Sequence, residues 1–398
     1  MGDNGRNRRG TRREWLTLCG SVTAGTAVLA GCADEDEHAA DEADGATDGT
    51  SRSSGDWPMF GADRQNTGYQ PHANGPTDDV SVRWRLEGGD QFNSSPAVID
   101  GTVYAACWDE NLYAVNSLTG EIEWEEEVGL VSSPPCVSKN IIYVSTSDGE
   151  LCGFNTKNGE HMWEEELNYT IKHPVPVDET IYILASGRLI SSARHSDEST
   201  ILLEDLGGVP EAPAIRGSNL FTGDRESALI YNIKSDEIEY RFENESGERM
   251  YDHSPTVVDD SIYISGSDSA VYAFDILNKQ IKWKYVVDGR TPTAPSVANG
   301  SVYFGSWNNY LYSVDTESGK MNWKFDAKTI LSEKPTVTDT TVYITAEDTL
   351  YAVDVDSGQE QWSFVTTGES TITDSPVVAE DVVYISSRNN TLYALEGA

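Results

Sequence analysis

Residues 95–124 read SPAVIDGTVYAACWDENLYAVNSLTGEIEW, and this stretch decides the fold. Its four short apolar runs occupy 95–99, 102–106, 112–116 and 121–124. Tight-turn pairs separate them, with Asp-Gly at 100–101 and Thr-Gly at 119–120. Alternating apolar residues bounded by such turns are typical of short antiparallel strands. The stretch therefore predicts a small sheet of four antiparallel strands.

The same unit recurs along the chain. Its first marker is a proline, found at positions 96, 135, 174, 213, 255, 295, 335 and 376. A tyrosine or phenylalanine stands eight residues after each of these prolines. A third marker follows the first seven prolines by 27 or 28 residues: Trp124, Trp163, Leu202, Tyr240, Trp283, Trp323 and Trp362. Repeated four-stranded antiparallel units of this length predict the blades of a β-propeller.

The eighth unit ends before its fourth strand. An unpaired Trp84 lies ahead of the first proline, inside the strand pattern 82–86. We therefore expect this N-terminal strand to complete the last blade and to close an all-β ring of eight blades. An open solenoid is the alternative, but closure removes the sheet edges that an open array would expose.

The composition is strongly acidic, with 66 Asp and Glu against 28 Lys and Arg and a formal net charge of −38. Nucleic-acid binding needs a basic face, so this charge argues against such a partner. The acids are spread along the chain, which favours a solvated acidic coat over a cation-binding or basic-partner surface. The overall pattern resembles that of haloarchaeal proteins, which are soluble in molar salt.

The N-terminus has the features of an export signal. Arg12 and Arg13 precede an uncharged stretch that is too short and too rich in small residues for a confident membrane helix. The sequence around the two arginines resembles a twin-arginine motif, and Leu-Ala-Gly before Cys32 resembles a lipobox. We expect residues 1–31 to be a lipoprotein signal and Cys32 to carry the lipid; an uncleaved anchor is the alternative. Either arrangement places the protein outside the cytoplasm, and a lipid on Cys32 would hold it to the outer face of the cell membrane.

The segment that follows differs from the repeat region. Residues 32–56 contain nine acids and few apolar residues, a composition that cannot bury enough surface to offset the entropy of ordering. We expect a disordered acidic linker there and a propeller over 57–398.

A family resemblance rests on the turn between the third and fourth strands. AVNSLTGEIEW at 114–124 resembles the tryptophan-docking motif of propellers with pyrroloquinoline-quinone (PQQ) repeats. Further matches lie at 153–163, 273–283, 313–323 and 352–362, although Asn278-Lys279 replaces Thr-Gly in one of them. The segment WPMFG at 57–61, followed by NTG at 66–68, is similar to the entry segment of such propellers. The resemblance is greatest to BamB-type lipoproteins, which implies a non-enzymatic role.

The chain offers no catalytic constellation. No nucleotide-binding, zinc-protease or nucleophile-elbow motif is present, and the cysteines lack the spacing of a metal site. His173 and His253 stand just before blade starts, where we expect satisfied structural histidines rather than ligands. The resemblance raises PQQ and Ca²⁺ as cofactors, but the chain lacks the adjacent cysteine pair found in many quinoprotein dehydrogenases. A buried carboxylate cluster with Asn and Arg in the channel would favour that enzyme alternative.

Strand alternation predicts that the loop between the second and third strands of each blade shares a face with the links between blades. On that face we expect Trp108, Trp307, Arg225 and Arg388 to bind a partner, because Trp and Arg often anchor interfaces. Alternatively, the two tryptophans cap the channel and the arginines offset local acids. The leading function is a cell-surface scaffold that engages other exported or membrane proteins. The alternatives are a channel-mouth binder of a small solute or glycan and a PQQ-dependent oxidoreductase.

Overall fold

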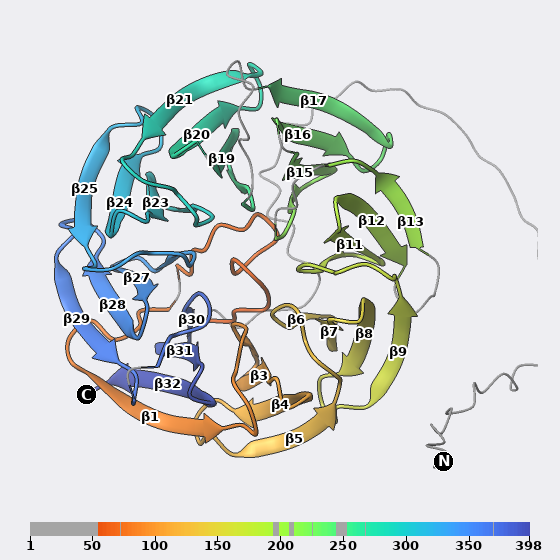
Figure 1. The fold of residues 1–398 in the computed structure, drawn as a ribbon, viewed down its shortest axis with the longest axis vertical. Coiled ribbons are helices and arrows are strands. Elements are labelled where there is room, and N and C mark those ends of the chain that lie inside the picture. The colour runs from red at the N-terminus through yellow and green to blue at the C-terminus, as the bar shows by residue number, and fades with distance from the viewer. Residues whose placement is uncertain are drawn as a thin grey trace, which may run out of the picture. The chain divides into compact units, whose positions relative to one another are not determined.

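The computed structural model describes residues 55–71, 73–193, 199–206, 211–224, 226–243, 253–266, 268–368 and 370–398. Apart from turns and isolated bridges, the regular structure of the described residues consists of 32 strands. These strands form eight antiparallel sheets of four strands each (Figure 1). These strands lie in the second of two compact units, Ala46–Ala398. Within the described part, no helix is long and apolar enough to cross a membrane. The eight-bladed all-β propeller is therefore confirmed.

Each blade runs from an inner strand to an outer strand. Blades 1 to 4 contain β2 (Ala97–Ile99), β3 (Thr102–Ala106), β4 (Asn111–Asn116) and β5 (Ile122–Glu127); β6 (Cys136–Ser138), β7 (Ile141–Ser145), β8 (Glu150–Asn155) and β9 (His161–Glu166); β10 (Val175–Val177), β11 (Thr180–Ala185), β12 (Arg188–Ala193) and β13 (Ser199–Leu203); β14 (Ala214–Arg216), β15 (Asn219–Gly223), β16 (Ser227–Asn232) and β17 (Glu237–Glu243).

Blades 5 to 8 repeat this order, except that the last blade takes its outer strand from the N-terminal side of the chain. They contain β18 (Thr256–Val258), β19 (Ser261–Gly266), β20 (Ala270–Asp275) and β21 (Gln280–Val286); β22 (Ser296–Ala298), β23 (Ser301–Gly305), β24 (Tyr310–Asp315) and β25 (Met321–Asp326); β26 (Thr336–Val337), β27 (Thr341–Ala346), β28 (Thr349–Asp354) and β29 (Glu360–Val365); β30 (Val377–Ala379), β31 (Val382–Ser387), β32 (Thr391–Gly397) and β1 (Val80–Glu87).

Burial falls from the axis of the ring to its rim. The second strands are almost wholly buried, as in β7 and β19, whereas most of the outer strand β5 is exposed. The hydrophobic clusters lie mainly between neighbouring blades; one cluster joins Tyr104 and Leu112 of blade 1 to Ile142 and Phe154 of blade 2. The buried apolar surface between sheets thus holds each blade to the next.

Tryptophans on the outer strands dock each blade onto the next one. Trp323 lies on the outer strand of blade 6. Its indole nitrogen donates to the carbonyl of Val355 in blade 7 at 2.9 Å. Its ring lies against Gly358, where a Cβ would come within 2.6 Å of the indole. Gly358 has a φ of 69°, a conformation that glycine adopts at little cost. Lys279, which replaces this glycine in blade 5, keeps a positive φ of 54°.

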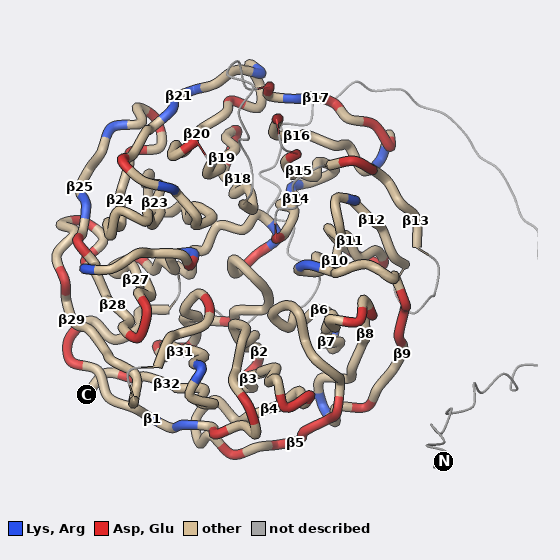
Figure 2. Tube along the Cα trace, in the orientation of Figure 1, with Lys and Arg blue, Asp and Glu red and all other residues tan. Residues whose placement is uncertain are grey.

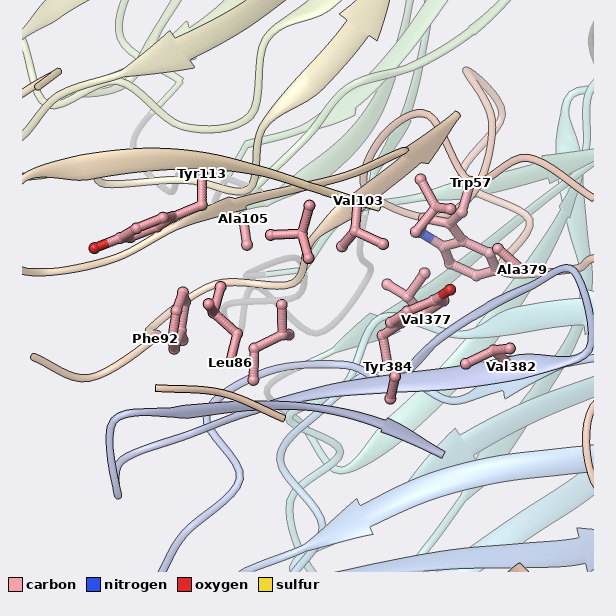
Figure 3. Packing of buried hydrophobic residues seen from close by; sticks show 14 of the residues in the cluster. Trp57, Leu86, Phe92, Val103, Ala105, Tyr113, Val377, Ala379, Val382 and Tyr384 are labelled. Atoms are coloured by element: carbon pink, nitrogen blue, oxygen red, sulfur yellow. The ribbon is translucent and has the colours of Figure 1, made fainter. Parts of the chain in front are cut away.

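The ring is closed where the first and last parts of the chain meet. β1 pairs antiparallel with β32, from Val80 opposite Gly397 to Glu87 opposite Thr391. The predicted closing strand over 82–86 is therefore confirmed and slightly longer than expected. The seam beside it has its own core, in which Val103 and Ala105 of blade 1 face Val377 and Tyr384 of blade 8 (Figure 3). Trp84 donates to the carbonyl of Ser117 at 2.8 Å, as Trp124, Trp283 and Trp323 do to the equivalent carbonyls in their own seams.

The entry segment at 57–70 lies inside the ring. Its backbone hydrogen-bonds to the inner strands of six blades, through Val98, Val137, Ile215, Val257, Val297 and Val337. Each of these six residues follows its repeat proline by two positions. The segment therefore crosses the centre of the ring, as the orange trace in Figure 1 shows, and occupies part of the channel.

Candidate functional site

A cavity of about 300 Å³ lies on the axis of the ring, where the inter-blade links reach the inner strands. Its walls come from residues just before the repeat prolines, and Phe60 of the entry segment contributes to its lining. Hydroxyl and charged side chains dominate these walls. The volume is at the lower limit of small-molecule pockets, so the cavity suits a small polar ligand.

Three carboxylates face this cavity from different blades: Glu211 in the link to blade 4, Glu333 in the link to blade 7 and Asp374 in the link to blade 8. Burial and then the neighbouring charges of Asp374 and Glu211 raise the pKa of Glu333 to about 8. Burial and the charge of Asp374 likewise raise the pKa of Glu211. Glu211 is also exposed to water, which weakens these effects on its carboxyl. The three acids therefore repel one another.

Asp374 is the most firmly held of the three acids. Its two carboxylate oxygens accept backbone hydrogen bonds from Ser95 at 2.8 Å and from Ser375 at 2.7 Å. Burial raises the pKa of Asp374, and these hydrogen bonds oppose the shift. By contrast, neither Glu211 nor Glu333 forms a salt bridge within the described residues.

Two lysines stand near the acids but differ in role. Lys334 is 5% exposed, and burial lowers its pKa to about 7 against the opposing charges of Asp63 and Glu211. Its ammonium donates to the hydroxyl of Thr256 at 3.3 Å and to the carbonyl of Pro295. Lys334 thus ties blade 7 to blades 5 and 6. Lys172 lines the cavity and remains available to offset the acids.

Two further polar groups in the cavity wall lack a hydrogen-bond partner among the residues that the structure describes. Ser94 is 7% exposed, and its hydroxyl has no hydrogen-bond partner among the described residues. Nδ1 of His173 is also buried and unpaired, while the ring packs on Phe60 with centroids 4.4 Å apart. Burial lowers the pKa of His173 to about 3, so this ring is neutral. The expectation of a satisfied structural histidine was therefore wrong for Nδ1 of His173, because the ring packs on Phe60 and its buried Nδ1 meets no hydrogen-bond partner in the described structure.

A metal centre finds no ready donor set in the part of the chain that the structure describes. No three His, Cys, Asp or Glu side chains there come together in a way that could hold a metal ion. The cavity also contains the carboxylates, but lysines rather than arginines accompany them. The cluster therefore matches only part of the pattern that would favour a quinone enzyme.

Three of the four predicted partner-binding residues can be located, and Arg225 lies outside the described residues. Trp108 lies on the β3–β4 loop of blade 1 and is 39% exposed, and Trp307 lies on the β23–β24 loop of blade 6 and is 43% exposed. Arg388 is exposed on the β31–β32 loop of blade 8. The predicted export and lipid positions Arg12, Arg13 and Cys32 also lie outside the described residues.

Backbone contacts show which face these loops occupy. The amide of Trp108 donates to Gln91 at 3.0 Å, and the amide of Trp307 donates to Arg290 at 2.9 Å. Gln91 and Arg290 belong to inter-blade links, so the loops and links share one face as expected, hereafter the link face. The guanidinium of Arg290 lies 5.2 Å from the centre of the Trp307 ring. Neither tryptophan lines the cavity, and blades 1 and 6 are not neighbours, so the predicted residues do not form one patch.

Charge is uneven around the rim. Figure 2 shows acidic residues along β5 and β9, and lysines along β21 and β25 on another part of the ring. Several of these lysines are paired: Lys282 lies 2.8 Å from Glu317, and Lys284 lies 2.8 Å from Asp268. The acidic residues of β5 belong to an exposed outer strand, in keeping with a solvated coat.

Apart from His173 and His253, the titratable residues of the cavity were not predicted from the sequence, because they belong to no motif with local spacing. A usable signal was nevertheless present in the repeat. The position two residues before the repeat proline is serine in blades 1 and 2, but it is charged or titratable in five other blades: Lys172, Glu211, His253, Glu333 and Asp374. Because every blade places this position at the axis, such departures from serine would have indicated the cluster.

Comparison with solved structures finds the same architecture. BamB from Moraxella catarrhalis superposes with a TM-score of 0.67 at 13% identity, covering 80% of this chain and 100% of that one. A europium-containing methanol dehydrogenase gives a TM-score of 0.72 at 11% identity, covering 86% and 98%. The quinohemoprotein alcohol dehydrogenase from Comamonas testosteroni gives 0.70 at 12% identity, covering 86% and 81%. At these identities the likeness shows the fold alone.

The sequence comparisons are more selective. No curated protein matches the chain significantly. A family model described as outer membrane protein assembly factor BamB matches residues 76–234, 177–306 and 287–398, which together span most of the chain. With its eight-bladed ring, its docking tryptophans and this match over nearly the whole propeller, the chain belongs to the BamB family of PQQ-like repeat propellers.

Proposed function

We propose that this protein is a non-enzymatic interaction scaffold, held outside the cytoplasm by a lipid on Cys32. The main support for the scaffold role is the match to the BamB family model, which extends over the whole repeat region. A propeller of this kind offers a rigid ring with variable loops, and such loops on rigid scaffolds are where binding residues concentrate. The partners would be other exported or membrane proteins.

The link face supports this proposal in a specific way. Trp108 and Trp307 expose large aromatic surfaces there, and Arg388 is exposed on the loop of the blade beside Trp108. Exposed Trp and Arg are enriched among residues that dominate binding energy. Because blades 1 and 8 are neighbours and blade 6 is not, the partner would contact the ring at separate points.

A quinone-dependent oxidoreductase is less well supported by the chemistry of the channel. PQQ carries carboxylates of its own, and Glu211, Glu333 and Asp374 in the cavity wall would repel them. The described residues also offer no preformed metal centre beside the cavity. We therefore propose no catalytic residues and no quinone cofactor, while the cavity itself favours a small-solute site as a second function.

The scaffold role is tested by co-purification from membranes of the native host. The full-length chain is compared with a variant that combines Trp108→Ala, Trp307→Ala, Arg225→Ala and Arg388→Ala. A matched control carries four substitutions on exposed outer-strand positions: Glu125→Ala, Glu126→Ala, Glu237→Ala and Glu360→Ala. Partners identified by quantitative mass spectrometry should be lost from the first variant and retained by the control.

Equal recovery of the same partners by both variants would refute the link-face assignment. The anchor has its own test, because Cys32→Ser should move the protein from the membrane fraction to the soluble extracytoplasmic fraction. Retention in the membrane fraction by that variant would contradict lipid anchoring at Cys32.

A further inference from the structure

Among the residues that the structure describes, the channel cavity has more carboxylates than lysines. Lys334 donates to Thr256 and Pro295 and interacts electrostatically with both Asp63 and Glu211. Asp63 and the three carboxylates of the cavity wall therefore share two lysines, Lys172 and Lys334. When all four acids are ionised, two negative charges are left without a lysine among these described groups.

These acids are not needed in this position by the fold. The equivalent position in blades 1 and 2 is Ser94 and Ser133, and those blades have the same four strands and the same inner-strand contact with the entry segment. The repeat therefore supplies an internal comparison in which serine performs the structural role. Glu211 and Glu333 depart from it without gaining a salt bridge in the described structure.

An independent observation points to a ligand rather than to isolated charges. Ser94 is more than nine-tenths buried, lines the same cavity and leaves its hydroxyl without a partner among the described residues. Buried polar groups are normally hydrogen-bonded, and a group without a partner raises the question of what binds there. A ligand that donates hydrogen bonds would satisfy both this hydroxyl and the carboxylates.

We propose that the cavity binds a small organic dication with two ammonium groups, such as a short linear diamine, between Glu211 on one side and Glu333 with Asp374 on the other. Blades 4 and 8 stand opposite each other in a ring of eight, so the acids lie on facing walls. Two separated ammonium groups match two separated sets of carboxylates. A single metal ion would need its ligands gathered around one point, and the described residues do not gather in that way.

The size and lining of the cavity agree with this ligand class. Its volume of about 300 Å³ accommodates a chain of a few carbons with two polar ends. Each ammonium is a three-donor group, and the walls offer carboxylate and serine oxygens as acceptors. This site is separate from the exposed tryptophans of the link face, so the proposal stands or falls independently of the scaffold role.

The test is isothermal titration of the purified full-length protein with 1,4-diaminobutane in molar salt. At about 1 M salt the Debye length is about 3 Å, which suppresses attraction by exposed surface acids. Saturable binding of one diamine per chain is expected, with weaker binding of 1-aminobutane and none of 1,4-butanediol. No saturable binding of the diamine would overturn the proposal.

Variants assign the binding to the cavity. Glu211→Gln combined with Glu333→Gln should weaken binding by about tenfold or more, since hydrogen bonds to charged groups are lost. The control pair Glu125→Gln and Glu126→Gln makes the same two substitutions on the exposed strand β5 and should leave affinity unaltered. If the glutamine pair folds poorly, the double variant Glu211→Ser with Glu333→Ser is used in its place, because serine is the residue found at this position in blades 1 and 2. Equal affinity of either cavity pair and the control pair would refute the assignment.

The number of protons released when the diamine binds is a second test of the site. In the described part of the chain, the charged and titratable groups that line the cavity with Glu333 are Glu211, Asp374, Lys172, Lys334, His173 and His253. At pH 7 the carboxyl of Glu333 is mostly protonated, because its pKa lies near 8. Binding a dication should release about one proton, measured from titrations in buffers of different ionisation enthalpy. Binding without proton release, or full displacement of the diamine by an equal concentration of Ca²⁺, would contradict a diammonium site at these acids.

Discussion

The hydrogen bond of a docking tryptophan can be isolated by comparing Trp323→Phe with Trp163→Phe. Both side chains pack beside a tyrosine, with ring centroids 5.8 Å apart for Tyr303 and Trp323 and 6.1 Å apart for Tyr143 and Trp163. The indole of Trp323 donates to Val355 at 2.9 Å, whereas the buried indole nitrogen of Trp163 has no acceptor in the described structure. The substitution to phenylalanine removes the same side-chain atoms at both sites but a hydrogen bond at only one.

The expected difference in the free energy of unfolding follows from that contrast. Trp323→Phe loses a hydrogen bond worth about 1 kcal/mol and leaves the carbonyl of Val355 without this donor. Trp163→Phe instead removes a buried unpaired donor, whose desolvation penalty is about 1 kcal/mol or more. We therefore expect Trp323→Phe to destabilise the propeller by about 2 kcal/mol more than Trp163→Phe. The assay is equilibrium urea unfolding at fixed salt, followed by far-ultraviolet circular dichroism. Equal losses, or a larger loss for Trp163→Phe, would refute the reasoning.

Four further outcomes are expected. Gly358→Ala should lower the free energy of unfolding by about 3 kcal/mol, because Gly358 has a positive φ and the added Cβ would clash with Trp323. Gly300 also has a positive φ, 74°, but open space beside it, so Gly300→Ala should lower the free energy of unfolding by only about 1 kcal/mol. Urea unfolding measures both values. Deleting residues 80–86 should expose the edge of β32, lower the melting temperature and promote aggregation; unchanged melting and a monomeric elution profile would favour an open array. Glu333 binds its proton more tightly in the folded state, so its contribution to stability is present at low pH and is lost as pH rises from about 4.5 to about 8; stability of Glu333→Gln should fall less over that window. Burial raises the pKa of Cys107 to about 11 and of Cys152 to about 12, so neither thiol should react with a thiol reagent at pH 8 until urea unfolds the chain; rapid labelling of the native protein would contradict their burial.

The face that carries the candidate partner-binding residues was predictable, but their grouping was not. Strand alternation alone places Trp108 and Trp307 on the link face, and the backbone contacts to Gln91 and Arg290 confirm it. Whether two loops are neighbours depends on their blade numbers around the ring. Blade 1 is next to blade 8 and not next to blade 6. The loop of Trp108 is therefore on a blade adjacent to that of Arg388, whereas Trp307 is on a more distant blade.

In the cavity, too, one part of the arrangement is readable from the sequence and another part is not. The repeat already aligns Glu211, Glu333 and Asp374 at one position of the blade, and that alignment is readable in the sequence. The pKa of Glu333 is not readable there, because it depends on desolvation and on charges brought from two other blades. The entry segment adds a further condition, since Phe60 and Asp63 act on the channel from a region outside the repeats.

By itself, the sequence determined the number of blades, the strands in each blade and the docking tryptophans, because these depend on local turns and on a pattern that each unit repeats. It also determined the closing strand, because the eighth unit lacks a partner that residues 82–86 supply. Only the tertiary structure decided that the entry segment crosses the ring and that three carboxylates share one cavity. Those features arise when closure brings eight distant links to a common axis, where burial and charge repulsion act between residues far apart in the chain.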